Sequence, residues 1–356
     1  MLRRRLVVPI GAVLAMSVML VACSTGSNSQ GSGSGTDYRA LIGTLNGSGA
    51  TFPKVFYEDV IAEFSDVAVK LTVNYNAVGS GSGKKDLAAG TSDWAGSDST
   101  VKEEEKGNFK GPFLYFPTVA APITVSFNLG KVRELHLSQT TLVRIFTGVI
   151  TSWNDPAIAT DNPGVDLPDQ SITVVVRSDG SGTTSNFSKY LAAVGGPDFT
   201  LAPGDTVTWP RAVAAKGNAG VAQAIKDTSG AIGYVDYSDA IATKLRTASI
   251  RNRAGNYINP SLDGATAALA NAKVKDDLTY SALDAAGDDS YPITAGTYVI
   301  VYEQPLRNAS ALRGWLSYIL TDGQKFAHDA DFASLPEDLR ARAFAQIDKV
   351  GTGGER

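Results

Sequence analysis

Arg177 stands in a run of small and polar residues whose types suit the binding of an anion. The stretch Arg177-Ser178-Asp179-Gly180-Ser181-Gly182-Thr183 follows an apolar β-branched segment and precedes residues at helical spacing. This order predicts a strand, a tight turn and a helix. The first amides of a helix lack intrahelical partners and attract anions. The stretch therefore fits an anion-binding loop, or a surface turn capped by Ser181 or Thr183 with Arg177 in solvent.

Two further glycine-rich segments have the same form. Residues 46–53 (Asn-Gly-Ser-Gly-Ala-Thr-Phe-Pro) precede a helical pattern that runs through Phe56 and Phe64. Residues 79–85 (Gly-Ser-Gly-Ser-Gly-Lys-Lys) follow an alternating strand pattern from Val69 to Tyr75. If the three helix starts converge, they form a cage of backbone amides around one arginine.

The elements that must position these loops alternate along the chain. Strand patterns occupy residues 172–176 and 231–237, and helical patterns occupy residues 141–150, 221–225, 312–320 and 339–347. Such alternation predicts an α/β fold whose sheets are covered by helices on both faces. Ligands in these folds bind at the carboxyl ends of the strands, where the three loops stand.

The N-terminus carries the features of a secretory signal. Three arginines, Arg3 to Arg5, precede an apolar run from Leu6 to Ala22, and small residues stand before Cys23. Cys23 is the single cysteine of the chain and matches the bacterial lipobox, so residues 1–22 are predicted as a signal peptide. Residues 23–43 are then a lipidated cysteine followed by a flexible Gly/Ser-rich tether. We expect an exported protein that is anchored to the cell membrane and faces the extracytoplasmic side.

Length and charge narrow the class of protein further. About 310 residues remain after the tether, which suffices for one large or two medium α/β domains. Removing Arg3, Arg4 and Arg5 with the signal lowers the formal net charge from −4 by three, to −7. The negative net charge repels nucleic acid, so nucleic acid is not an expected ligand. Net charge also cannot attract an anion, so an anion site must depend on groups in its immediate surroundings.

Familiar enzyme motifs fit the loops poorly. A Walker A loop would need glycine at Val78 and serine or threonine at Lys85, and no Gly-x-Ser-x-Gly elbow occurs at the three junctions. Residues 82–85 match Ser-x-x-Lys, but no Lys-Thr-Gly follows. The two histidines, His136 and His328, stand in helical surface patterns, so neither is a good candidate for the base of a Ser-His-Asp triad. With one cysteine and two histidines, a metal site built from these residue types is excluded. The chain is interpreted as a binding protein, not an enzyme.

The three loops, in this order, resemble the phosphate-binding proteins of bacterial ABC phosphate transporters, the PstS family. The resemblance covers residue 46 to the C-terminal helices. It is carried by residues 47–53, 79–81, 90–98, 116–118, 150–156, 177–183, 217–221 and 230–235. The family pattern implies a phosphate site, which we transfer by position. Its predicted residues are Thr51, Phe52, Ser80, Asp98, Arg177, Ser181, Gly182 and Thr183.

Two carboxylates have special roles in the site that the resemblance implies. Asp179 is expected to hold the guanidinium of Arg177 in place. Asp98 is expected to accept the proton of hydrogen phosphate, which sulfate lacks near neutral pH. A site built to receive an OH group rejects an analogue without it by about 10⁴–10⁵-fold. Asp98 is therefore expected to select phosphate over sulfate.

The resemblance also implies a fold and partners. The expected architecture is a two-lobed periplasmic-binding-protein fold of type II-like form, with a two-stranded hinge. The first lobe is expected to comprise residues 44–127 and 295–356, and the second lobe residues 128–294. A monomer without cofactors is expected to deliver phosphate to the permease and ATPase subunits of an ABC transporter.

Two alternatives remain at this level. The same scaffold fits a site for another tetrahedral oxyanion, or a phosphate sensor. The other alternative is an exported hydrolase that uses Ser82 or Ser181 as its nucleophile.

Overall fold

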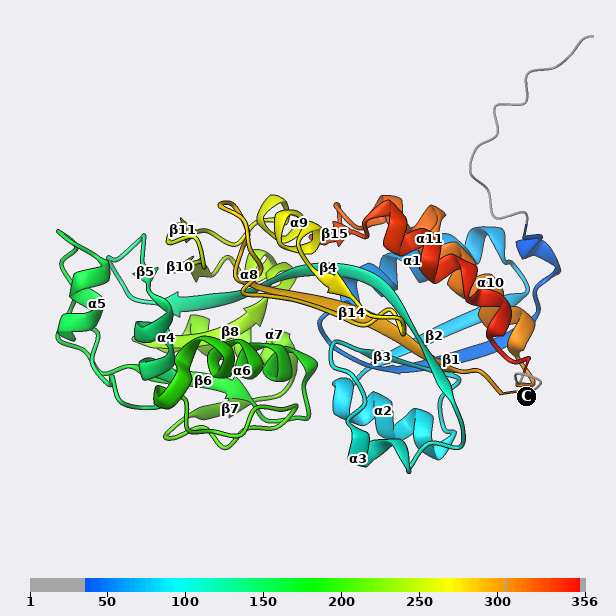
Figure 1. The fold of residues 1–356 in the computed structure, drawn as a ribbon, viewed down its shortest axis with the longest axis horizontal. Helices are drawn as coiled ribbons and strands as arrows, with labels where there is room; N and C mark the ends of the chain where they lie inside the picture. The colour runs from blue at the N-terminus through cyan, green and yellow to red at the C-terminus, as the bar shows by residue number, and fades with distance from the viewer. Residues whose placement is uncertain (1–35, 305, 353–356) are drawn as a thin grey trace, which may run out of the picture. The chain divides into compact units, whose positions relative to one another are not determined.

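One continuous sheet has two halves that share two central strands. The computed structural model describes residues 36–304 and 306–352. In order of pairing, the strands are β2 (Leu71–Ala77), β1 (Gly43–Gly49), β3 (Trp94–Ser97), β14 (Ile293–Tyr302), β4 (Phe113–Asn128), β8 (Ala231–Asp236), β6 (Thr173–Arg177) and β7 (Val213–Ala215). Figure 1 shows β4 and β14 lying side by side and passing from one half to the other.

The pairing of β4 and β14 explains how the halves are joined. β4 pairs with β14 through residues 113–122 and with β8 through residues 123–128. β14 pairs with β3 through residues 298–300, all in antiparallel register. The outer strands of each half pair in parallel, β1 with β2 and β3, and β6 with β7 and β8. The carboxyl ends of these parallel strands are the places where ligands bind in such sheets.

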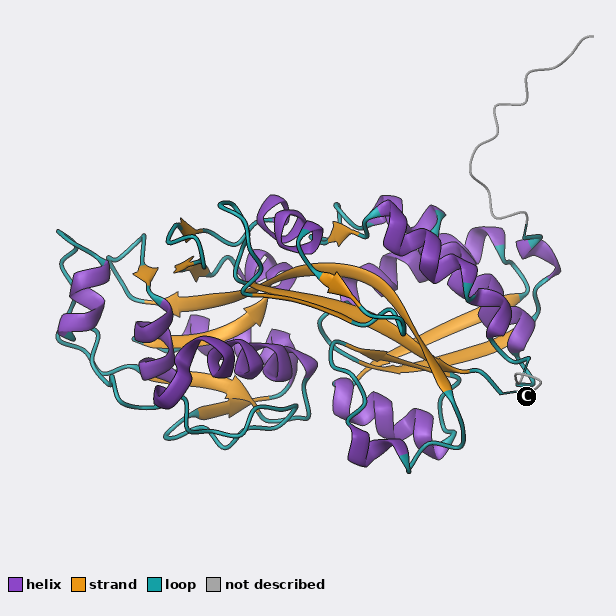
Figure 2. Cartoon of the chain, in the orientation of Figure 1, coloured by secondary structure: helices purple, strands orange, loops and turns teal. Residues whose placement is uncertain are grey.

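Helices follow most of the parallel strands and cover the sheet, as Figure 2 shows. The first half has α1 (Lys54–Val67), α2 (Ser80–Ala89) and α3 (Glu103–Lys106), together with the C-terminal α10 (Ala309–Leu320) and α11 (Glu337–Ala345). The segment between β4 and β14 contains α4 (Gln139–Phe146), α5 (Pro156–Asp161), α6 (Gly182–Gly195), α7 (Gly217–Asp227), α8 (Tyr237–Thr243) and α9 (Leu262–Ala270).

Short elements complete the fold. The short strands are β5 (His136–Leu137), β9 (Arg246–Thr247), β10 (Ser249–Arg251), β11 (Tyr257–Ile258), β12 (Lys273–Val274), β13 (Tyr280–Leu283) and β15 (Ala333–Ser334). The 3-10 helices are η1 (Tyr38–Ala40), η2 (Gly196–Asp198), η3 (Asp322–Phe326) and η4 (Ile347–Lys349).

Helix α1 illustrates how sequence spacing builds the core. Its buried residues, Phe56, Tyr57, Val60 and Phe64, recur at helical spacing and face the sheet, while the other side of the helix is exposed. Tyr57 contacts Trp94 of β3 edge to face, with 5.5 Å between ring centroids. This packing fixes the start of α1 against the end of β1, where the first glycine-rich segment lies.

The predicted alternation of strands and helices is confirmed, with local corrections. β2 begins at Leu71 and leaves Val69 exposed, and the helix predicted over residues 141–150 ends at Phe146. The helical patterns assigned to His136 and His328 are wrong. His136 lies in β5 and pairs with Ser249 of β10, while His328 lies in a turn. A pairing partner over 100 residues away decides the structure of His136, and local spacing does not reveal it.

The predicted signal peptide and Cys23 lie outside the described residues. Within the described residues of the predicted tether, Tyr38–Ala40 forms η1 and Gly43 begins β1. The Tyr38 ring contacts the Phe64 ring edge to face, with centroids 5.5 Å apart. The chain is thus packed against α1 before the first strand begins.

Candidate functional site

Four junctions between a strand and a helix meet where the two halves of the sheet face each other. They are the β1–α1, β2–α2, β6–α6 and β7–α7 junctions. Hydrogen bonds cross between the halves: the Gly81 amide donates to the Gly180 carbonyl at 3.0 Å, the Asn218 amide donates to Thr51 Oγ1 at 3.4 Å, and Asn186 Nδ2 donates to the Asp98 carbonyl at 2.6 Å. The structure therefore brings together the three predicted loops and adds a fourth.

Arg177 is buried, so the interpretation of this stretch as a surface turn with Arg177 in solvent is wrong. Its side chain is 1% exposed. Nε donates to Asp179 Oδ1 at 2.8 Å, Nη2 pairs with Asp179 Oδ2, and Nη1 donates to Asn218 Oδ1 at 3.2 Å. These bonds use three of the five guanidinium donors and leave two N–H groups to serve an anion.

Asp179 is held in its charged form beside Arg177. Its Oδ1 also accepts a hydrogen bond from the Gly217 amide at 3.0 Å. Burial by itself would raise the pKa of Asp179. The hydrogen bond and charge of Arg177, with the Gly217 amide, outweigh burial and hold the pKa below its usual value. The pair fixes the guanidinium plane at the end of β6.

Asp98 and Ser80 form a second polar group opposite Arg177. Both residues are buried. Ser80 Oγ donates to Asp98 Oδ2 at 3.4 Å and accepts from the Asp98 amide at 3.2 Å. Among the described residues, Asp98 Oδ1 is buried without a hydrogen-bond partner. An unpartnered carboxylate oxygen in a buried site is costly unless a ligand supplies a donor.

Burial also changes the acidity of Asp98. It raises the pKa of this carboxyl to about 7, although the Thr297 hydroxyl, the Arg177 charge and the Ser80 hydroxyl act in the opposite direction. The carboxyl therefore exchanges its proton near neutral pH. It can accept a hydrogen bond when ionised and donate one when protonated.

The start of α6 approaches Asp98 and Ser80 very closely. A Cβ atom at Gly182 would lie 2.6 Å from Ser80 Oγ and 2.7 Å from Asp98 Cβ, so glycine is required in this arrangement. Ser181 caps the helix by accepting from the Thr184 amide at 3.1 Å. Thr183 Oγ1 accepts from Asn218 Nδ2 at 3.2 Å. The halves of the sheet are in direct contact at this point.

Thr51 and Phe52 occupy the β1–α1 junction in different ways. Thr51 Oγ1 faces the other half of the sheet, where it accepts from the Asn218 amide. The Phe52 side chain is fully buried, and its ring contacts Phe332 with centroids 5.5 Å apart. Phe52 can therefore offer a ligand its backbone amide, while its side chain belongs to the core.

The comparisons with known proteins place the chain in a family. Residues 28–323 match the family model of the PBP superfamily domain. The phosphate-binding protein PstS of Pasteurella multocida is 34% identical over 313 residues, which cover 85% of this chain and 89% of that protein. The chain belongs to the PstS family. The phosphate-binding protein PstS of Methanocaldococcus jannaschii is likewise 34% identical, over 93% of this chain and 92% of the relative.

A solved structure extends the likeness to the fold. The phosphate-bound high-affinity periplasmic phosphate-binding protein PfluDING matches with a TM-score of 0.71 at 22% identity, over 85% of this chain and 94% of that chain. At this identity the match concerns the fold alone. It confirms the predicted two-lobed α/β fold, in which β4 and β14 connect the lobes. We call the half with β1, β2 and β3 the first lobe, and the half with β6, β7 and β8 the second lobe.

In this PstS-family chain, Asn218 is a site residue to which sequence reasoning assigned no role. It is fully buried at the start of α7. Its side chain joins Arg177 to Thr183, and its amide reaches Thr51 of the other lobe. The glycine before it could have indicated this role, because Gly217-Asn218 follows a strand and begins a helix, and the three recognised loops have the same order.

Lys84 is another buried charge that connects the lobes. Its Nζ lies 2.9 Å from Asp205 Oδ2 in the second lobe and 3.3 Å from Glu105 Oε2 in the first lobe. Nζ also donates to Ser99 Oγ at 3.3 Å. The ion pair with Asp205 therefore joins the two lobes in this structure.

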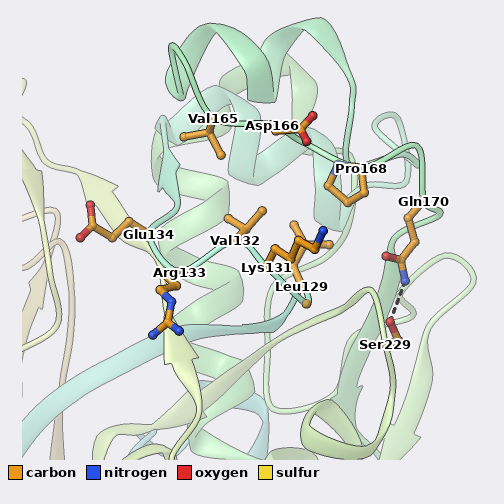
Figure 3. A pocket seen from close by; sticks show the side chains of 11 residues that line it. Leu129, Lys131, Val132, Arg133, Glu134, Val165, Asp166, Pro168, Gln170 and Ser229 are labelled. Carbon is orange, nitrogen blue, oxygen red and sulfur yellow. Dashed lines mark hydrogen bonds between the residues drawn. The ribbon is translucent and has the colours of Figure 1, made fainter.

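Two hollows differ in their relation to this site. A cavity of about 300 Å³ adjoins it, and its lining includes Thr51, Asp179 and Asn218 together with Lys54 and Lys216. A hollow of about 660 Å³, shown in Figure 3, lies at the end of β4 around Leu129 and Val132. No predicted site residue lines the larger hollow.

Residues 36–304 and 306–352 contain neither a candidate membrane-spanning helix nor a candidate metal-binding cluster. No helix in this part is both long and apolar enough to cross a membrane. Likewise, no group of three or more histidine, cysteine, aspartate or glutamate side chains in this part could hold a metal ion.

Proposed function

We propose that this protein is an extracytoplasmic solute-binding protein that captures inorganic phosphate between its two lobes. It delivers the phosphate to an ABC transporter for import. The observation that carries the proposal is the buried, unpartnered oxygen of Asp98 opposite the Arg177 guanidinium, in a chain of the PstS family. A ligand that satisfies both groups must carry negative charge and also a proton to donate. Hydrogen phosphate has both properties.

The proposed ligand contacts come from both lobes. Thr51, the Phe52 amide and Ser80 act from the first lobe, and Arg177 with Ser181, Gly182 and Thr183 acts from the second lobe. Each hydrogen bond to a charged group contributes about 1.5–3 kcal/mol, which replaces the water shell of the anion. Arg177 presents two N–H groups in a plane that matches phosphate oxygens, and Asp179 holds that plane. A ligand touching both lobes stabilises the closed state.

The role is binding and not catalysis. Ser181, one nucleophile of the hydrolase alternative, uses its Oγ to cap α6. Neither histidine lies in the group of residues that surrounds Asp98 and Arg177. The relatives matched by the chain carry the name of a phosphate-binding protein. The proposed partners are therefore phosphate, and the permease and ATPase subunits of a transporter that receives it from this monomer.

The location and lobe boundaries complete the proposal. The protein is held at the extracytoplasmic face of the cell membrane through a lipid on Cys23, after removal of residues 1–22. The first lobe comprises residues 44–127 and 295–356, and the second comprises residues 128–294. These boundaries put the crossing strands β4 and β14 at the exchange points of the chain.

Titration of ligand-stripped protein tests the proposed function. In calorimetry near neutral pH, phosphate and arsenate should bind, because both carry a hydroxyl proton. Sulfate should bind about 10⁴-fold more weakly or worse. A chromogenic phosphate ester and a β-lactam should give no turnover. Binding of sulfate as tight as phosphate, or steady release of the chromophore, would each contradict the proposal.

Replacement of Cys23 by alanine tests the anchor. We expect Cys23→Ala to fold and bind phosphate like the wild type, but to move from the membrane fraction to the soluble secreted fraction, because it lacks the acylated thiol. Fractionation followed by immunoblotting measures this shift, and Ser24→Ala serves as the matched control that stays with the membrane. If Cys23→Ala remains in membranes after a salt wash, the lipid anchor is refuted.

A further inference from the structure

Thr297 lies at an irregular point of the crossing strand β14. The register between β14 and β4 shifts there, because Gly296 pairs with Ala120 whereas Tyr298 pairs with Pro117. On its other edge, β14 pairs with β3 through Tyr298 and Ser97. Continuing this antiparallel register by one residue puts Thr297 opposite Asp98. A crossing strand thus reaches the carboxyl group of the proposed site.

The hydroxyl of Thr297 and the free oxygen of Asp98 complement each other. Both atoms are buried, and neither has a hydrogen-bond partner within the described part of the chain. A carboxylate oxygen has two lone pairs, so the Thr297 hydroxyl can donate to one of them and leave the other for the proton of a ligand. The Thr297 backbone is fixed on the opposite side, where Thr118 Oγ1 donates to its carbonyl at 3.4 Å. Thr118 in turn contacts the Tyr57 hydroxyl at 3.3 Å.

We propose that Thr297 is a positioning residue, whose hydroxyl holds the Asp98 carboxylate as an acceptor for the ligand's proton. The inference rests on the proposed function, and it adds Thr297 to the residues that determine the selectivity for phosphate over sulfate. It also means that the strand connecting the lobes supports the group that distinguishes phosphate from sulfate. The bulge is then a functional feature, since a regular register would change the direction of Thr297.

The charges around Asp98 set the direction of the pH effect. Burial raises the pKa of Asp98 most strongly, and the Asp205 charge raises it further. The Thr297 hydroxyl, the Arg177 charge and the Ser80 hydroxyl lower it. Tyr57, Tyr75 and Tyr298 also face this carboxyl, but burial raises the pKa of each phenol, so they stay neutral near pH 7. Removal of the Thr297 hydroxyl should therefore raise the pKa of Asp98.

Thr297→Val keeps the shape of the side chain and removes the hydroxyl. Asp98 rejects sulfate only while it is ionised, because a protonated carboxyl can donate to sulfate. As the pH falls, the variant should lose its preference for phosphate at a pH about one unit or more above that of the wild type, the scale of one hydrogen bond to a charged group. Near neutral pH its phosphate-to-sulfate affinity ratio should be about tenfold lower. Calorimetry with both anions from pH 5.5 to 9 measures the shift.

Three further variants separate positioning from a structural role. Thr297→Ser retains the hydroxyl and should restore the wild-type pH profile, whereas Thr297→Ala should behave like valine. Thr294→Val is the matched control in the same strand, because the Thr294 hydroxyl donates to the Tyr291 carbonyl at 2.9 Å. This control should leave the profile unchanged, whatever its effect on stability.

The outcomes distinguish the two levels of the proposal. If the wild type fails to bind phosphate, the proposed function fails. If the wild type binds phosphate and rejects sulfate, but valine and alanine at position 297 keep its pH midpoint, only the role of Thr297 is overturned. The Asp98 carboxyl ¹³C chemical shift of ligand-free protein gives an independent readout, and it should titrate at a higher pH in both variants.

Discussion

Asp98→Asn is expected to narrow the preference for phosphate over sulfate by at least about a hundredfold. The amide keeps the size of the carboxylate and one acceptor oxygen, but it adds an NH₂ donor and removes the charge. In the variant, a sulfate oxygen can accept a hydrogen bond from the NH₂ group, whereas in the wild type it faces a carboxylate oxygen that can only accept. Phosphate should change much less, because the lost charge-assisted hydrogen bond is partly offset by the removal of repulsion. Calorimetry of both proteins with both anions measures the ratio.

The same substitution should remove a pH dependence. In this structure the pKa of Asp98 is raised from 3.8 to about 7 by burial. Between pH 3.8 and about 7, the Asp98 carboxyl binds a proton more strongly in the closed state than in an open state where it is solvated. Closure without ligand is therefore favoured at low pH and loses this contribution as the pH rises through about 7. Wild-type selectivity should fall below that pH, whereas the asparagine variant should show a flat ratio.

Asp93→Asn is the matched control for this prediction. Asp93 stands just before β3, at the opposite end of the strand from Asp98, and its Oδ2 accepts from the Asn46 amide at 2.7 Å. This variant should keep the wild-type ratio of affinities. Should Asp98→Asn reject sulfate as strongly as the wild type does, discrimination arises elsewhere and the role of Asp98 is wrong.

Gly182→Ala should weaken phosphate binding by about fivefold to a hundredfold without weakening the fold. The added Cβ would lie 2.7 Å from Asp98 Cβ and 2.6 Å from Ser80 Oγ, both in the opposite lobe. Overpacking of this kind costs about 1–3 kcal/mol, and it acts only when the lobes are closed. Alanine is also the better helix former at the first residue of α6. The melting temperature of ligand-free protein should therefore stay level or rise while the Kd increases.

Gly220→Ala controls for the substitution itself. Gly220 lies in α7, and a Cβ there would approach no atom closer than 3.8 Å. Its phosphate affinity should equal that of the wild type. Calorimetry and thermal unfolding of the two variants give the comparison. Unchanged affinity in Gly182→Ala would mean that the bound state does not require the close approach of α6 to Asp98.

Sequence patterns could predict those parts of the site that depend on local structure. A strand followed by glycines and a helix occurs at each recognised loop, so the positions of Ser80 and Ser181 at helix starts, and of Arg177 at a strand end, follow from nearby residues. The apolar spacing of α1 likewise predicts which of its faces is buried. These features need no knowledge of distant pairing, because turn chemistry and periodicity determine them.

The remaining features depend on residues far apart in the chain. Asn218 meets Thr51 across 167 positions, and Lys84 meets Asp205 from another lobe. The position of Thr297 opposite Asp98 depends on the register of β14 with β3 and on a shift against β4. A register change of one residue would turn its side chain to the other face. No local pattern contains that information, and the same reason explains the error at His136.

The passage of β4 and β14 between the lobes has a consequence for the order of folding. The first lobe needs both ends of the sequence: Tyr302 donates to the Leu87 carbonyl across 215 positions, and β3 pairs with β14. The second lobe pairs β6 with β7 and β8, all within residues 173–236. Long loops must close before distant contacts form, so local contacts form sooner. After export, the lobe with Arg177 should mature first, and Asp98 should gain its buried setting only when β14 pairs with β3.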